Sequence, residues 1–144
     1  MLDLKDLNVA AAASRGAFIE LEHPVTGEPL MDADGKPYGI EGLGEDSAEV
    51  RKIDRKHADK RAEKMRKGNI DAALKQDALE QDRIERLTVA TKSWYLPPLN
   101  GETLPFTPAN ARRVYGGEDL AWIADQFEKG MRDRTRFFST GSTR

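Results

Sequence analysis

Alternation between apolar and polar positions marks the first regular element of the chain. From Ala17 the run A-F-I-E-L-E-H alternates with a period of two, which predicts a strand that Pro24 and Gly27 end. The later run K-P-Y-G-I-E-G-L-G, residues 36–44, predicts a second or third strand that its glycines make irregular. We therefore expect a β-hairpin or small meander, which needs a helix packed against it to be stable.

A helical repeat replaces this alternation in the next segment. Asp46 and Glu49 have the spacing of a capping box, and Gly68 ends the repeat, so a helix is predicted over residues 47–67. Its narrow apolar stripe consists of Val50, Ile53 and His57. The rest of this helix is charged, which indicates that most of its surface is solvated.

Three further helices are predicted in the remainder of the chain. Asn69 caps a helix over residues 70–94, a short helix covers residues 109–115, and an amphipathic helix covers residues 118–138. The face of the first consists of Ile84, Leu87, Thr91 and Trp94. The expected core face of the last consists of Leu120, Ile123, Ala124, Phe127 and Met131.

The pattern as a whole predicts an α+β fold that is mostly α. An N-terminal β-hairpin or small meander is followed by four helices, of which the C-terminal ones are amphipathic. Residues 1–16 form an N-terminal segment, as a short helix or a mobile terminus. Residues 17–138 are expected to form a single α+β domain, and residues 139–144 a disordered polar tail.

Composition narrows the class of protein. Of 144 residues, 38% are hydrophobic and 33% are charged, which predicts a modest core with solvated helices. The absence of cysteine excludes disulfides, and no apolar run is long enough to cross a membrane, so we expect a soluble, unsecreted protein. Residues 1–45 carry nine acids and three bases, whereas residues 46–67 carry nine bases and five acids. This asymmetry either steers partners or joins the two segments within one chain.

The segment D-A-D-G raises the question of a calcium loop. Gly35 suits the sixth position of an EF-hand loop, and ligand positions then fall on Asp32, Asp34 and Glu41. The first ligand position, however, is Leu30, which has no side-chain oxygen, and a strand is predicted where the entering helix is needed. We therefore interpret D-A-D-G as a tight turn and predict no metal site.

Catalytic chemistry has little support in the sequence. His23 and His57 lie far apart, and neither a phosphate-binding loop nor a nucleophile elbow occurs. We therefore predict a non-enzymatic protein with no catalytic residue and no cofactor. The basic helix 51–67 offers nucleic-acid binding as an alternative, but its interspersed acids favour a solvated helix with internal ion pairs.

Aromatic residues are concentrated in the C-terminal half of the chain. Most are expected to form the core, and a minority to bind a protein partner through exposed rings. The predicted partner-binding residues are Trp94, Tyr95, Trp122, Phe137 and Phe138.

The order of several motifs resembles a known family. After the first strand come P-V-T-G-E-P-L, D-A-D-G-K-P and I-E-G-L-G-E-D-S, which leads into the charged helix. The second half contains A-T-K-S-W, L-P-F-T-P-A-N, D-L-A-W-I-A-D-Q and a late R-F-F. Over residues 17–138 this order resembles the tail assembly chaperones of long-tailed (siphophage-type) bacteriophages and related prophages.

The resemblance implies a non-enzymatic protein in the cytoplasm of an infected or lysogenic host. Such chaperones coat apolar helices of the tape-measure protein and recruit tail-tube subunits, and whether this chain forms homo-oligomers stays open. One alternative is a structural protein of the virion or the head–tail junction. Another is a nucleic-acid-associated protein that uses helix 51–67, although nucleic acid is the less expected partner.

Overall fold

A small antiparallel sheet lies at the centre of the protein. The computed structural model describes residues 2–73 and 75–142, and its strands lie in the order β1-β2-β3. Their bounds are Ala17–Glu20 for β1, Gly39–Gly42 for β2 and Thr91–Tyr95 for β3. Ile19 of β1 and Trp94 of β3 both lie opposite Ile40 of β2. The sheet therefore joins the N-terminal strands to a strand that follows the long helices.

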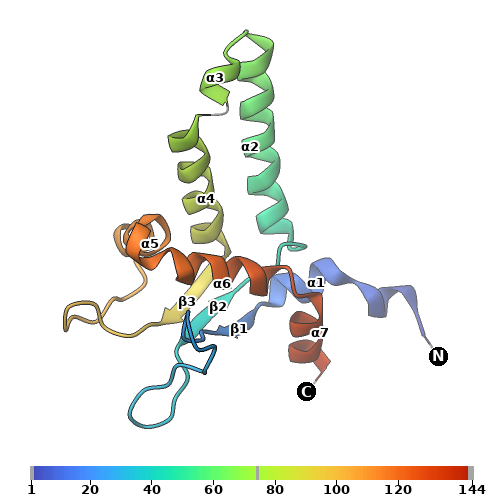
Figure 1. Ribbon diagram of the computed structural model, residues 1–144. Helices are drawn as coiled ribbons and strands as arrows, with labels where there is room; N and C mark the ends of the chain where they lie inside the picture. The colour runs from blue at the N-terminus through green and yellow to red at the C-terminus, as the bar shows by residue number, and fades with distance from the viewer. Residues whose placement is uncertain (1, 74, 143–144) are drawn as a thin grey trace.

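Helices α2 and α4 form a long hairpin that projects from the sheet (Figure 1). The bounds are Ala48–Arg66 for α2, Ile70–Ala73 for the short α3 and Gln76–Ala90 for α4. Ser47 is the N-cap of α2, because its Oγ accepts a hydrogen bond from the Val50 N–H at 3.2 Å. Gly68, at φ +81°, permits the turn at the far end of α2.

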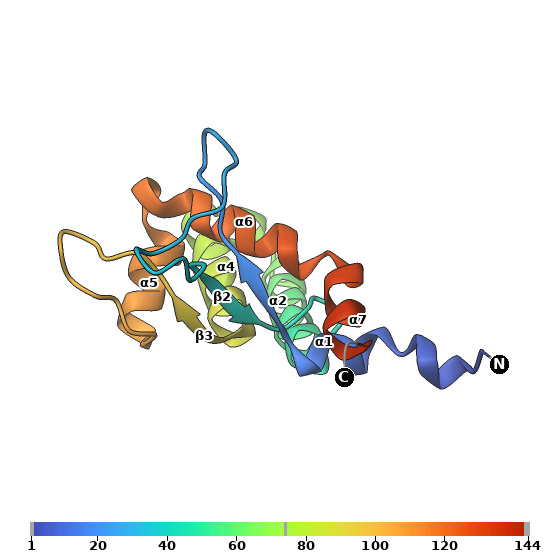
Figure 2. The same cartoon turned by 90° about the horizontal axis from the view of Figure 1, so that it is seen from below.

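The other helices come from the two ends of the chain. Near the N-terminus are η1, Leu4–Leu7, and α1, Val9–Arg15; near the C-terminus are α5, Pro108–Gly116, η2, Glu118–Leu120, α6, Ala121–Met131, and α7, Arg134–Ser142. Helix α6 runs across the sheet towards α7, which contacts α1 (Figure 1). In Figure 2 the strands lie nearer the viewer than α2 and α4.

The core lies between the sheet and helices α4, α5 and α6. Its fully buried side chains include Ile40, Leu87, Val114 and Phe127, one from each of these elements. The predicted core face of the last helix is confirmed for Ile123, Ala124, Phe127 and Met131, which are buried. Leu120 is half-buried against the same core.

Two glycines allow α6 to approach the sheet closely. A Cβ atom on Gly42 of β2 would lie 2.4 Å from Cε1 of Phe127. A Cβ atom on Gly130 of α6 would lie 2.7 Å from Cγ2 of Ile19 on β1. Real Cβ atoms essentially never come this close to another heavy atom, so both positions require glycine at this helix–sheet distance.

The prediction of one helix over residues 70–94 is wrong. The helical segment ends at Ala90, and residues 91–95 form strand β3, paired with β2. The Thr91 hydroxyl donates to the Leu87 carbonyl oxygen at 2.7 Å and accepts from the Tyr115 hydroxyl, 2.6 Å away. Thr91 and Trp94 therefore lie on a strand and share no helical face with Leu87. An α+β fold that is mostly α is confirmed, but its third strand follows the hairpin.

Other boundaries also differ from the predicted ones. The helix over residues 118–138 is divided into η2, α6 and α7, with a break at 132–133. Residues 139–142 continue α7 where a disordered tail was expected, and 143–144 lie outside the described residues. The N-terminal segment is helical in η1 and α1, with Ala12 and Ala13 buried. The cap of α2 is Ser47 and not Asp46.

The contact between Gly42 and Phe127 gives a test of this packing. Gly42→Ala should lower the free energy of unfolding by about 1–3 kcal/mol, because the added methyl group meets the Phe127 ring. Phe127→Leu removes the ring atoms that Cβ would meet. In urea titrations the double variant should therefore lose less free energy of unfolding than the two single variants lose in total. The expected coupling free energy is about 0.5–3 kcal/mol. Additive effects would contradict the close contact.

Candidate functional site

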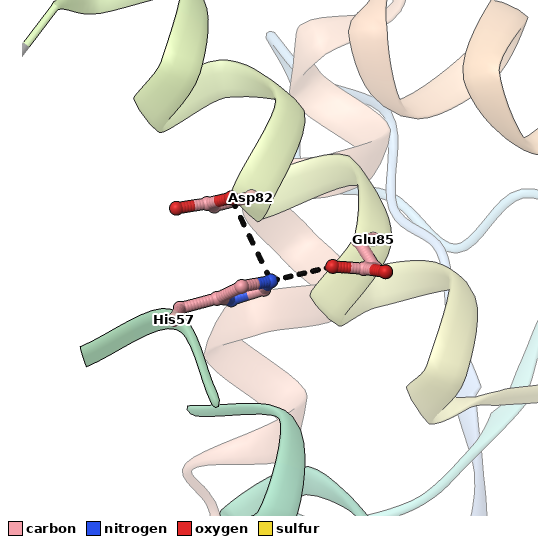
Figure 3. Close-up of side chains that lie close together, drawn as sticks. All are labelled: His57, Asp82 and Glu85. Carbon is pink, nitrogen blue, oxygen red and sulfur yellow. Dashed lines mark hydrogen bonds and ion pairs between the residues drawn. The ribbon is translucent and has the colours of Figure 1, made fainter. Parts of the chain in front are cut away.

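A cluster of ionisable side chains joins the two long helices of the hairpin. His57 comes from α2, and Asp82 and Glu85 come from α4 (Figure 3). The Nε2 atom of His57 lies 2.6 Å from Oε1 of Glu85 and 3.6 Å from Oδ1 of Asp82. Because an ionised carboxylate only accepts hydrogen bonds, the hydrogen lies on Nε2, and Nε2–H donates to Glu85. The imidazole is buried, whereas the Glu85 side chain is 44% exposed.

Basic side chains of α2 complete the same cluster. Lys60 Nζ lies 2.7 Å from Oδ1 of Asp82, and Arg61 contacts Oδ2 at 3.3 Å. Burial raises the pKa of Asp82, but the hydrogen bond from Lys60 and the neighbouring positive charges outweigh it, so the pKa lies below its ordinary value. The hydrogen bond from His57 lowers the pKa of Glu85, to which Lys56 also donates at 3.4 Å. Both carboxyls are therefore ionised at neutral pH.

The donor set of this cluster resembles that of a metal site only in part. One imidazole nitrogen and two carboxylate oxygens lie within 4.8 Å of one another, as in a three-ligand site. Both oxygens of Asp82, however, are already bonded to cationic side chains. A divalent ion would have to displace Lys60 and Arg61 or lie beside their charges. The geometry therefore fits an ion-pair network better than a metal centre.

A second group of ion pairs joins the two helices of the hairpin to each other and joins α4 to α6. The guanidinium of Arg86 on α4 contacts Asp54 of α2 at 2.7 Å. The guanidinium of Arg83 contacts Glu128 at 2.5 Å and Asp125 at 2.7 Å, and both acids lie on α6. These bonds raise the pKa of Arg83. We call all the ionisable side chains in these two groups of contacts, on α2, α4 and α6, the charged seam. Their ion pairs hold the three helices in one arrangement.

Sequence reasoning missed the charged seam, although a signal was present. His57, Lys60 and Arg61 are spaced as i, i+3 and i+4, which places them on one face of α2. Asp82 and Glu85 are spaced as i and i+3 on α4. Antiparallel pairing of the two helices brings these faces together, so only their register was needed to predict the network.

An apolar groove lies near the N-terminal end of α6. Its volume is about 160 Å³. The lining residues are all apolar and come from the segment after β3, from α5 and from the start of α6: Leu96, Pro97, Pro98, Leu99, Leu104, Val114, Leu120, Trp122 and Ile123. A groove of this composition suits aliphatic side chains of a ligand.

The tryptophans predicted to bind a partner both lie near this groove. Trp94 is half-buried, its Nε1 donates to the Leu104 carbonyl oxygen at 2.7 Å, and its ring contacts Phe106 edge-on at 5.0 Å. Trp122 is half-buried and lines the groove itself. Leu104 is therefore shared between the Trp94 contact and the groove. Trp122 is the better placed of the two for contact with a ligand.

Tyr95 lies beside the D-A-D-G turn. Its hydroxyl donates to Oδ2 of Asp32 at 2.6 Å, which raises the pKa of Tyr95 to about 12. The other oxygen of Asp32 accepts from the backbone N–H groups of Asp34 and Lys36, and Gly35 has φ +82°. The predicted tight turn is confirmed, and Asp32 uses both carboxylate oxygens within the protein.

The two phenylalanines near the C-terminus lie at the opposite end of α6. Phe137 is only 2% exposed, and its ring lies against Gly44, where a Cβ atom would approach to 3.1 Å. Phe138 is half-buried. The structure therefore brings Trp94 and Trp122 to one end of the molecule and places Phe137 and Phe138 at the other, near α1.

No protein-family model, curated protein or solved structure matches this chain. Within the described residues, no helix combines the length and the apolar character needed to cross a bilayer. Any functional proposal therefore depends on the geometry of the hairpin, the charged seam and the apolar groove, together with the resemblance in the motifs.

The charged seam gives a prediction for stability and its pH dependence. Asp82→Asn should lower the free energy of unfolding by about 1–3 kcal/mol at pH 7, because His57, Lys60 and Arg61 lose a buried acceptor charge. Asp125→Asn, at an exposed carboxylate paired with Arg83, is the control and should cost less than about 1 kcal/mol.

The pH dependence follows from the direction of the pKa shift. The pKa of Asp82 is lower in the folded protein than its ordinary value of 3.8, so its stabilisation is complete above that value. The stability difference between the native chain and Asp82→Asn should therefore be constant near neutral pH and shrink as the pH falls below about 4. Urea titrations across this range measure it; a difference that grows on acidification would contradict the assignment.

The same network predicts the response to metal ions. An excess of Zn²⁺ should leave the melting temperature unchanged, because Lys60 and Arg61 occupy the carboxylate oxygens of Asp82. A rise in melting temperature that His57→Gln abolishes would show that a metal ion displaces them. Calorimetric titration provides the same comparison at constant temperature.

Proposed function

We propose that this chain is a non-enzymatic phage tail assembly chaperone that binds the tape-measure protein and tail-tube subunits in the host cytoplasm. The resemblance over residues 17–138 motivates this proposal. The structural observation that carries it is the projecting hairpin (Figure 1). Three apolar side chains are exposed at its free end. These are Met65 at 43%, Ile70 at 55% and Leu79 at 37% exposure.

The hairpin has different chemistry along its length. Near the sheet, Val50 of α2 and Leu87 of α4 are fully buried, so packing holds this end. Further out, the charged seam between His57 and Asp82 joins the helices. At the free end the apolar side chains remain exposed. Exposed apolar side chains on helices are suited to packing against a further amphipathic helix.

A tape-measure helix is the partner that this surface fits best. The resemblance implies a long partner with apolar helical faces, and side-by-side packing with a two-helix hairpin buries such a face. The contact area at the free end is small, which gives moderate affinity and permits release during assembly. The charged seam supports a non-enzymatic role, because its acids are engaged in holding helices together.

Two alternatives are distinguished by specific observations. Nucleic-acid binding through residues 51–67 needs free cations, but many of these side chains are engaged in ion pairs with carboxylates: Lys56, Lys60, Arg61, Arg66 and Lys67. A structural role in the virion requires the chain to be present in finished particles. Mass spectrometry of purified particles tests that role directly.

The experiment for the proposed function is co-expression with the tape-measure protein. The native chain should increase the soluble yield of that protein, and the double variant Met65→Glu/Ile70→Glu should lose most of the increase. Loss of two apolar anchors, at about 1.4 kcal/mol or more in total, weakens binding at least about tenfold.

A matched control separates this effect from a general effect of charge. Val25 is 87% exposed in the turn after β1, away from the hairpin, so Val25→Glu adds a charge without touching the proposed surface. It should retain the native soluble yield. Equal loss in both variants, or no gain from the native chain together with stoichiometric amounts in particles, would favour the structural alternative.

A further inference from the structure

An apolar arm extends from the N-terminal end of the protein. We define the arm as residues 2–7; its leucines are 73% exposed at Leu2, 87% at Leu4 and 52% at Leu7. Its conformation is defined, because residues Leu4–Leu7 form η1 and the side chain of Asp3 accepts from the Lys5 N–H at 2.9 Å. Figures 1 and 2 both show it pointing away from the body.

The arm is attached to a fixed base. Asn8 caps α1 through a hydrogen bond from the Ala11 N–H at 2.9 Å, and Ala12 and Ala13 of α1 are buried. Helix α1 contacts α7, and the Gly44 N–H donates to the Ala13 carbonyl oxygen at 3.0 Å. The leucines therefore project from a base that belongs to the folded body.

The apolar groove lies at the opposite end of the molecule from the arm. Leu120, Trp122 and Ile123 place it at the N-terminal end of α6, whereas the arm lies beyond the C-terminal end of α6, past α7 (Figures 1 and 2). No charged side chain is among its lining residues. Its composition therefore matches leucine side chains and excludes a charged ligand.

We propose that the arm of one copy docks into the apolar groove of a second copy, with Leu4 and its neighbouring leucines in contact with Leu99 and Trp122. The arm cannot reach the groove of its own chain. Helix α6 has 11 residues and is about 16 Å long. The six residues of the arm span at most about 22 Å when fully extended. The base of the arm lies past α7, whose diameter adds about 10 Å to the length of α6, so about 26 Å separates the base from the groove (Figures 1 and 2). Docking therefore requires another copy.

The geometry of this contact determines the type of assembly. Arm and groove are different surfaces at opposite ends, so the contact is heterologous and leaves one free arm and one free groove on each pair. Copies therefore add head to tail. A six-residue arm buries much less than the roughly 800 Å² per partner of a standard interface, so the contact between two isolated copies is weak.

A long partner would strengthen this weak contact. Copies held next to one another on a single tape-measure helix have a high effective concentration, so arm-to-groove contacts form along the row. Only this last step rests on the proposed function. The contact itself exists without any partner, and it is measured in the purified protein alone.

Disulfide trapping tests the contact, because the native chain has no cysteine. Leu4→Cys and Leu99→Cys are purified separately, mixed and oxidised mildly. Mixed disulfide dimers should form several-fold faster than when Leu4→Cys is mixed with Val25→Cys, whose thiol lies outside the groove and is more exposed than that of the half-buried position 99. Circular dichroism and melting temperature verify that each variant is folded.

The combined variant distinguishes the arrangement of copies. Leu4→Cys/Leu99→Cys in one chain should produce a ladder of dimers, trimers and longer disulfide-linked species. A predominance of cross-linked monomer would show that the arm reaches its own groove and would overturn the proposal. Trapping that is no faster than with the Val25→Cys control would overturn the proposal as well. So would a main product in which two copies are linked through the cysteines at position 4. Successful trapping with no gain in soluble tape-measure protein would refute the proposed function and leave this contact in place.

Discussion

The close approach of α6 to the sheet is the constraint on which the other features depend. Gly42 and Gly130 lack the Cβ atoms that would separate the helix from β1 and β2. Phe127 can therefore fill the space above Gly42 and contact the ring of Tyr115, 5.9 Å away between centroids. Because dense packing tolerates little extra volume, a shift of α6 would disturb β2, α5 and the hairpin base together.

Helix α6 links the sheet to the other parts of the molecule. Its outward acids Asp125 and Glu128 hold Arg83, which orients α4 and thus the hairpin. Its N-terminal residues form part of the apolar groove. At its other end the Met131 carbonyl accepts from the Glu45 N–H at 3.0 Å, close to where Asp46 binds Arg134 of α7. The hairpin, the groove and the base of the arm are thus connected through one helix.

Local patterns predicted the elements whose stability is local or amphipathic. Helix α2 and the buried positions Ile123, Phe127 and Met131 followed from periodicity. Strand β3 was missed because residues 91–95 continue the spacing of α4, and only the distant partner β2 makes them extended. The charged seam was missed for the same reason, since the register between α2 and α4 is a tertiary property. The partner-binding role of the five aromatic residues remains a prediction.

The basic side chains of α2, which carry much of the charge asymmetry of the sequence, form their described ion pairs within the hairpin. Among the described ion pairs, basic side chains of α2 pair with carboxylates of α4, as Lys60 does with Asp82, or of α2 itself, and not with acids of residues 2–45. Ion pairs therefore join the two helices, and the exposed large apolar side chains that the structure describes in the hairpin are Met65, Ile70 and Leu79 at the free end and Val89 near the sheet. Since ion pairs at solvated positions contribute little to binding, the proposed function assigns the partner contact to the apolar free end. The arm and the groove likewise present apolar surface: the arm exposes three leucines, and the groove is lined by aliphatic side chains together with Trp122.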